Sequence, residues 1–168
     1  HSVPPRRSSY VLSSLTATDD AEITPKSLTP VIVADDKVYD GNTTATLSQQ
    51  TLTGVVGSDI VSLVVGSANF ANANVGTWTV TASGLTLGGA QSGNYVLSSL
   101  TATDEAEITP KSLTPVIVAD DKIYNGNTTA ILSSQTLTGV VGLDEVSLVV
   151  GSANFANANV GTWTVTAS

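Results

Sequence analysis

The chain has 168 residues, of which 12% are charged, and its formal net charge at pH 7 is −8. Its only arginines, Arg6 and Arg7, lie in the leader, so the chain lacks the basic surface of a nucleic-acid-binding protein, and no apolar run is long enough to insert into a membrane. It contains no cysteine and no methionine, which excludes disulfide bonds and thiolate chemistry.

The first 25 residues precede the first strong strand signal. Residues 1–8, HSVPPRRS, are interpreted as a leader or a cloning remnant. Residues 9–25 correspond to residues 94–110 further along the chain, so we expect them to be the last strand of a preceding repeat. Because the chain begins with His1 instead of Met, we expect it to be a piece of a longer protein.

Short strand signals fill the following residues. TPVIVA (29–34) is apolar on both faces, which predicts a central strand, whereas IVSLVV (60–65) and GTWTVTAS (76–83) show the two-residue alternation of half-buried strands. The inward positions of these two alternating runs are predicted to be Val61, Leu63, Val65, Trp78, Val80 and Ala82. Further strand signals follow in NYVLSSL (94–100) and TATDEAEI (101–108).

Turn residues separate these strands, and no stretch has a sustained helical period. Seven or eight short strands in about 85 residues are typical of a β-sandwich. The sequence therefore predicts an all-β fold built from tandem Ig-like β-sandwich domains.

The chain is an internal repeat with an offset of 85 residues. Residues 10–83 align with residues 95–168 without a gap, and seven of the 74 pairs differ. The differing pairs are Asp20/Glu105, Val38/Ile123, Asp40/Asn125, Thr46/Ile131, Gln49/Ser134, Ser58/Leu143 and Ile60/Glu145. This period exceeds the 20–50 residues of solenoid repeats, so we expect separate domains. We predict one complete repeat over 26–110 and a second over 111–168 that is truncated at its C-terminal end.

KVYDGN (37–42) returns as KIYNGN (122–127), and both stretches are predicted to be tight turns. Asp-Gly and Asn-Gly pairs favour such turns because these residues tolerate positive φ. The change from Asp40 to Asn125 removes a charge that a general acid or a hard-metal ligand would need, but it suits a turn in either copy. The turn residues are Tyr39, Asp40, Gly41, Tyr124, Asn125 and Gly126. The two tyrosine rings are expected to be buried, with hydroxyls that reach nearby backbone.

The residues offer little support for catalysis. The only histidine is His1, so no base accompanies a serine or threonine nucleophile, and the glycines form no phosphate-binding loop. We therefore expect no enzyme. The acid pairs Asp35/Asp36 and Asp120/Asp121 are either parts of solvated loops or weak calcium ligands, with Asp19, Asp20, Asp104 and Glu105 as further contributors. Calcium is the only cofactor considered.

The run SANFANANVGTW (67–78) allows a second binding hypothesis. Asn72 and Asn74 could present amides to a sugar beside a Trp78 platform. Asparagines in such runs more often bond to their own backbone, and the alternation around Trp78 favours a core position. Flat threonine arrays of the ice-binding kind are not expected, because the threonines are scattered over short strands.

Read in order, ITPKSLTP, KVYDGNTT, GVVGSDIVSL, ANVGTWTVTASGLTLGG, GNYVL and AEITP resemble a bacterial YDG/MBG-type repeat domain of large surface adhesins. The resemblance implies an Ig-like domain that acts as a spacer in a stalk, with no agreed catalytic residues. The tyrosine–aspartate–glycine motif maps to Tyr39, Asp40 and Gly41, and in the second copy to Tyr124, Asn125 and Gly126.

We therefore expect a structural stalk repeat of an extracellular or cell-surface bacterial adhesin, whose partners are its neighbouring repeats. Two alternatives stay open. The domain could bind glycans or host proteins. Residues 9–25 of one molecule could also complete residues 111–168 of another by strand addition, which would give head-to-tail association. Nucleic acid and membrane insertion are not expected.

Overall fold

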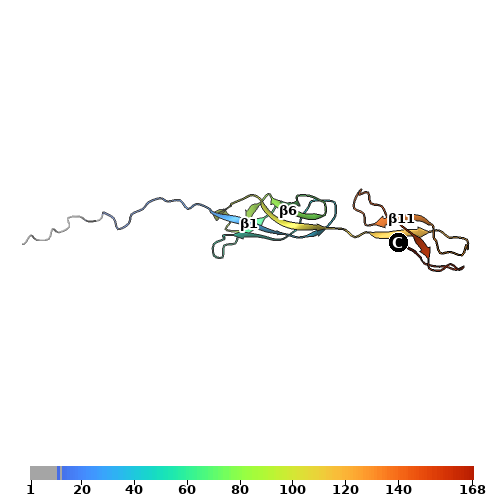
Figure 1. Cartoon of the computed structure of the whole chain (residues 1–168). Helices are drawn as coiled ribbons and strands as arrows, with labels where there is room; N and C mark the ends of the chain where they lie inside the picture. Colours follow the sequence, from blue (N-terminus) through green and yellow to red (C-terminus); the bar gives the residue numbers. More distant parts are fainter. Residues whose placement is uncertain (1–10, 12) are drawn as a thin grey trace, which may run out of the picture.

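The computed structural model describes residue 11 and residues 13–168. Within these residues the chain forms thirteen β-strands and one three-residue 3-10 helix, η1 (Ser92–Asn94) (Figure 1). The expected all-β fold class is confirmed. The described residues include no helix with the length and apolar character of a membrane span.

We call residues 26–110 the first unit and residues 111–168 the second unit. The strands of the first unit are β1 (Lys26–Ala34), β2 (Lys37–Val38), β3 (Leu47–Thr53), β4 (Ser62–Val64), β5 (Ser67–Phe70), β6 (Gly76–Ser83), β7 (Thr86–Gly88), β8 (Tyr95–Leu97) and β9 (Ala102–Thr109). They form a three-stranded sheet in the order β3-β1-β8, a four-stranded sheet in the order β2-β9-β6-β5, and the pair β4-β7.

Strand β9 is the last strand of the first unit and lies inside its largest sheet. It pairs antiparallel with β6, from Gly76 opposite Ile108 to Ala82 opposite Ala102, and parallel with β2. Strand β1 is central in the other sheet, antiparallel to β3 and parallel to β8. Both sheets therefore contain one parallel and at least one antiparallel pairing.

The core of the first unit connects strand β1 to strands β6 and β9 of the other sheet. Its buried members are Ile32, Leu63, Ala68, Phe70, Val80, Ala82, Leu85, Ala106 and Ile108. The alternation predicted for GTWTVTAS is confirmed, because Val80 and Ala82 are buried and the intervening threonines are exposed. Trp78 packs against this core, as the alternation indicated.

One strand expectation is wrong. TPVIVA was predicted to be covered on both faces, but Val31 and Val33 are 41% and 39% exposed on the outer face of β1. Strand β1 is central because it has a neighbour on each side, while its outer face lacks a covering layer among the described residues. A run of β-branched residues thus indicated strand, but not burial of both faces.

The second unit repeats only part of this arrangement. Its strands are β10 (Thr114–Ala119), β11 (Leu132–Thr138), β12 (Ala153–Phe155) and β13 (Val165–Ala167). They form the pairs β10-β11 and β12-β13, which reproduce β1-β3 and β5-β6 with the same register. The counterparts of β2 and β4 are not strands here, because in the first unit these strands pair with β9 and β7.

Residues 13–25 form no strand and are exposed along their whole length. In Figure 1 this segment leaves the first unit at the end opposite to the second unit. At the other end, β9 runs through Pro110 to Leu113 directly into β10, so the two units follow one another along the chain (Figure 1).

Candidate functional site at the joint between the units

The KVYDGN turn is held together by the ammonium group of Lys37. Its Nζ donates to the main-chain oxygen of Asn42 at 2.9 Å, to the side-chain Oδ1 of Asn42 at 3.0 Å and to the main-chain oxygen of Thr44 at 3.1 Å. It also lies 5.6 Å from the centroid of the Phe70 ring. The lysine therefore ties the turn to itself and to the aromatic ring beneath it.

The turn has the same geometry in both copies despite the aspartate-to-asparagine difference. Asn42 N–H donates to Asp40 Oδ1 at 3.1 Å, and Asn127 N–H donates to Asn125 Oδ1 at 3.3 Å. The following glycine has φ of 78° at Gly41 and 79° in the second copy. Only the carboxylate adds an ion pair, with 2.7 Å between Asp40 Oδ1 and Lys37 Nζ. Hydrogen bonding from Lys37 lowers the pKa of Asp40.

Tyr39 extends from this turn to the second unit. Its hydroxyl donates to Oδ2 of Asp144 at 2.9 Å, a hydrogen bond that raises the pKa of Tyr39. The expectation of a buried ring with a backbone partner is therefore wrong: the ring is half-buried and its partner is a side chain of the neighbouring unit. Tyr124, which has no following unit beside it in this chain, is 60% exposed.

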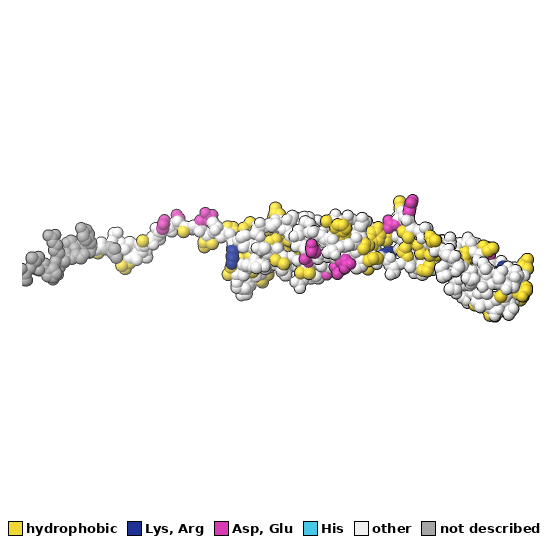
Figure 2. All heavy atoms as spheres, viewed as in Figure 1, with side chains coloured by type: hydrophobic (Ala, Val, Ile, Leu, Met, Phe, Trp, Pro, Cys, Tyr) yellow, Lys and Arg dark blue, Asp and Glu magenta, His cyan; other side chains and the backbone are white. Residues whose placement is uncertain are grey.

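Apolar side chains surround this hydrogen bond. A cavity of about 180 Å³ lies between the units and is lined by Tyr39, Val75, Pro110, Lys111, Leu113, Gly139, Val140, Val141, Asp144 and Val146. In Figure 2, hydrophobic side chains gather where the first unit meets the second. A Cβ added at Gly41 would lie 3.1 Å from Cγ1 of Val141, so glycine serves both the turn and the close approach.

The loop that carries Asp144 has a counterpart in the first unit with a different partner. There, Tyr95 donates its hydroxyl hydrogen to Oδ2 of Asp59 and accepts a hydrogen bond from Val56 N–H at 3.1 Å. The bond to Asp59 raises the pKa of Tyr95. The same aspartate thus binds a tyrosine of its own unit in one copy and a tyrosine of the preceding unit in the other.

Sequence reasoning missed this aspartate, although the repeat contains a signal for it. Asp59 and Asp144 are retained in both copies, while the residues on either side differ, as the pairs Ser58/Leu143 and Ile60/Glu145 show. A retained charge between variable neighbours points to a specific contact.

The calcium candidates do not gather into one site. Oδ1 of Asp36 accepts a hydrogen bond from Glu107 N–H at 2.6 Å, and Oδ2 of Asp104 accepts one from Ala34 N–H at 2.9 Å. These carboxylates bind the backbone across the two sheets. Asp35 and Asp120 donate their backbone N–H groups to neighbouring strands, and Asp121 lies at the rim of a cavity. Within the described residues, no three acidic or histidine side chains are grouped as metal ligands would be.

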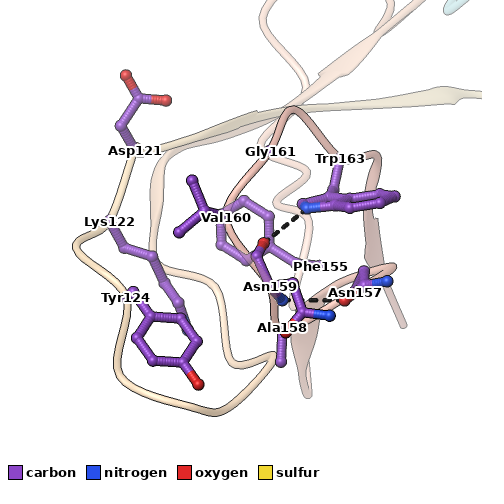
Figure 3. Close-up of a pocket in the computed structure, with 10 residues that line it drawn as sticks. All are labelled: Asp121, Lys122, Tyr124, Phe155, Asn157, Ala158, Asn159, Val160, Gly161 and Trp163. Atoms are coloured by element: carbon purple, nitrogen blue, oxygen red, sulfur yellow. Dashed lines mark hydrogen bonds between the residues drawn. The ribbon is translucent and has the colours of Figure 1, made fainter.

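That cavity, of about 270 Å³, is the most prominent hollow of the second unit (Figure 3). Tyr124, Phe155 and Trp163 line it. Its asparagines bond within their own loop: Trp163 Nε1–H donates to the main-chain oxygen of Asn159 at 2.8 Å, and Asn159 N–H donates to Asn157 Oδ1 at 2.9 Å.

The first unit contains the same two bonds. Trp78 Nε1–H donates to the main-chain oxygen of Asn74 at 2.7 Å, and Asn74 N–H donates to Asn72 Oδ1 at 2.9 Å. Oδ1 of Asn72 therefore accepts from the loop itself, whereas a sugar-binding amide would direct that oxygen outward.

Comparison with protein families finds two matches to the YDG domain, over residues 24–103 and 109–168. The chain belongs to the YDG domain family. No curated protein and no solved structure was found to match it. In this YDG protein, the tyrosine of the first motif contacts the next YDG unit, the aspartate pairs with the lysine of its own turn, and the glycine allows the approach of Val141.

Proposed function

We propose that this YDG protein is a structural spacer, in which tandem Ig-like β-sandwich units over 26–110 and from 111 onward are joined end to end. The observation that supports this proposal is the contact of Tyr39 with Asp144 across the joint. It uses residues that are present in both copies, so the same joint can form at every step of a longer array. A short connection through Pro110 restricts bending further.

A spacer of this kind suits the stalk of a bacterial cell-surface or secreted adhesin, which holds a binding tip away from the cell. Few charges and short loops would protect such a stalk from proteases. We propose an extracellular or cell-surface location and assign no catalytic residue.

The rigidity of the joint can be tested with spin labels, because the chain has no native cysteine. Thr51→Cys on β3 and Thr136→Cys on β11 are equivalent exposed positions, one in each unit. We expect a narrow distance distribution between the labels by double electron–electron resonance.

Two variants make this test specific. Tyr39→Phe should broaden the distribution, and Tyr124→Phe, which removes the same hydroxyl away from the joint, should leave it unchanged. A broad distribution in the parent protein would refute a rigid spacer.

A second candidate function is the binding of a glycan or a host protein. The observation in its favour is the aromatic lining of the cavity in Figure 3, which could stack on a sugar ring. Glycan-array binding that is lost on Trp163→Ala, but not on a change at Val31, would support it. The absence of any bound glycan would favour the spacer.

A further inference from the structure

The two units present the same core residues in two different states. Val80 and Ala82 are both 0% exposed in the first unit, whereas their counterparts Val165 and Ala167 are only partly buried. Trp163, the counterpart of the half-buried Trp78, is 39% exposed. Since these residues are identical in type, the difference comes from what covers them.

Strand β9 covers them in the first unit. Ala106 and Ile108 point inward from it and are 4% and 0% exposed. Its backbone pairs along the whole of β6 and along β2, and its Asp104 carboxylate accepts a hydrogen bond from the backbone of β1. Within residues 111–168 no strand occupies the corresponding place.

Two cavities mark the open place in the second unit. The first is the cavity of Figure 3, which lies between Lys122 and Gly161. Their counterparts Lys37 and Gly76 both pair with Ile108, so this cavity is where an isoleucine side chain would enter. The second, of about 350 Å³, is lined by Pro115, Ile117, Leu148, Val149, Val150, Val165, Thr166, Ala167 and Ser168 and lies towards the opposite end of the same slot.

The chain contains a segment with the sequence of the strand that would fill this slot. Residues 16–24, TATDDAEIT, repeat residues 101–109 with one difference, Asp20 for Glu105. In the structure this segment is exposed and unpaired along its length, and its Ile23 is 97% exposed. Figure 2 shows it as a thin extension of the molecule.

We propose that residues 17–24 of one copy insert as the missing strand into the second unit of another copy, so that copies associate head to tail. Insertion within one chain is disfavoured, because the segment leaves the first unit at the end away from the second (Figure 1). The association does not depend on the spacer role, since it would form whether the joint is rigid or flexible.

The register follows from the pairing of β6 with β9. Ile23 should lie opposite Gly161, Ala21 opposite Trp163, and Ala17 opposite Ala167. Asp19 should accept a hydrogen bond from the backbone N–H of Ala119, as Asp104 does from Ala34. The inserted strand is therefore specified by side chains as well as by backbone pairing.

Light scattering on the full chain tests the association. We expect the mass to rise above the 17.0 kDa of one chain as concentration increases, through twice that value to longer head-to-tail species. Ile23→Ser should keep the protein monomeric at concentrations where the parent associates. Glu22→Ser is the matched control, because its counterpart Glu107 faces outward in β9, and it should associate like the parent.

An engineered disulfide tests the register without relying on stability. Thr18 should face Thr166, as Thr103 faces Thr81, so Thr18→Cys with Thr166→Cys should yield disulfide-linked oligomers on a non-reducing gel. Asp19→Cys with Thr166→Cys puts the thiols on opposite faces and should not. A parent protein that is monomeric at every concentration, association that survives Ile23→Ser, or cross-linking in the shifted pair would overturn the proposal.

Discussion

The paired substitutions Val80→Ala and Val165→Ala test whether strand β9 seals the core. The two valines occupy equivalent positions, and the segments around them have the same sequence. Val80 is 0% exposed under β9, whereas Val165 is partly exposed beside the open slot. The two substitutions delete the same atoms and differ only in burial.

The expected magnitudes follow from this difference. Removing two buried methyl groups costs about 1.6 kcal/mol at about 0.8 kcal/mol each. The cavity left in a sealed core raises the loss at Val80 to about 2–3 kcal/mol. At Val165 part of the side chain is already in water and the site can collapse, so we expect a loss below about 1 kcal/mol.

Tryptophan fluorescence during urea unfolding can report on each unit separately, because each contains one tryptophan. A Trp163→Phe background leaves Trp78 to follow the first unit, and the reverse background follows the second. Ile23→Ser in both backgrounds prevents strand exchange from covering Val165. In the first unit the loss should lower the melting temperature by about 10 °C or more.

Equal losses of stability at the two valines would refute the reasoning. They would mean that the second unit buries its core as completely as the first without a strand in the position of β9.

Three further predictions concern the joint and the turns. Gly41→Ala should broaden the distribution of distances between spin labels on the two units, whereas Gly126→Ala, at the same φ but with open space around it, should strain only its own turn. The pKa of Tyr95 is raised in the folded state, so its contribution to stability is complete below a pH of about 10 and is lost as pH rises through the folded-state pKa; alkaline melting curves should show this loss, and Tyr95→Phe should remove the pH dependence. The pKa of Asp40 is lowered, so its contribution is present above a pH of about 4 and is lost as pH falls through the folded-state pKa; Asp40→Asn should remove this small acid dependence and keep the turn, as the second copy does.

The strands were the most predictable part of this fold. Alternation in GTWTVTAS identified the inward face of β6, since a strand buried on one side imposes a two-residue period. The period cannot show whether a second layer exists, and the exposure of Val31 and Val33 was therefore missed. Turn chemistry at Asp40 and Gly41 is local, and it could be read from adjacent residues.

The joint was not predictable in the same way. Whether Tyr39 turns into its own unit or towards the next depends on how two units are arranged, and that arrangement leaves no periodic trace in the sequence. The role of Asp144 was missed for the same reason, since its partner is 105 residues away. Comparison of the two copies around positions 58–60 and 143–145 was the one available signal.

Because β9 is the final strand of its unit and lies inside the largest sheet, a unit cannot close until its last residues have been synthesised. During translation or export, each nascent unit exposes an unfilled groove while nearly identical closing strands exist in its neighbours. Any one of those strands fits, so the sequence similarity between adjacent units favours misassembly during folding. Divergence at inward positions of β9 would be the simplest protection, and its two copies here differ only at an outward position, Asp20/Glu105.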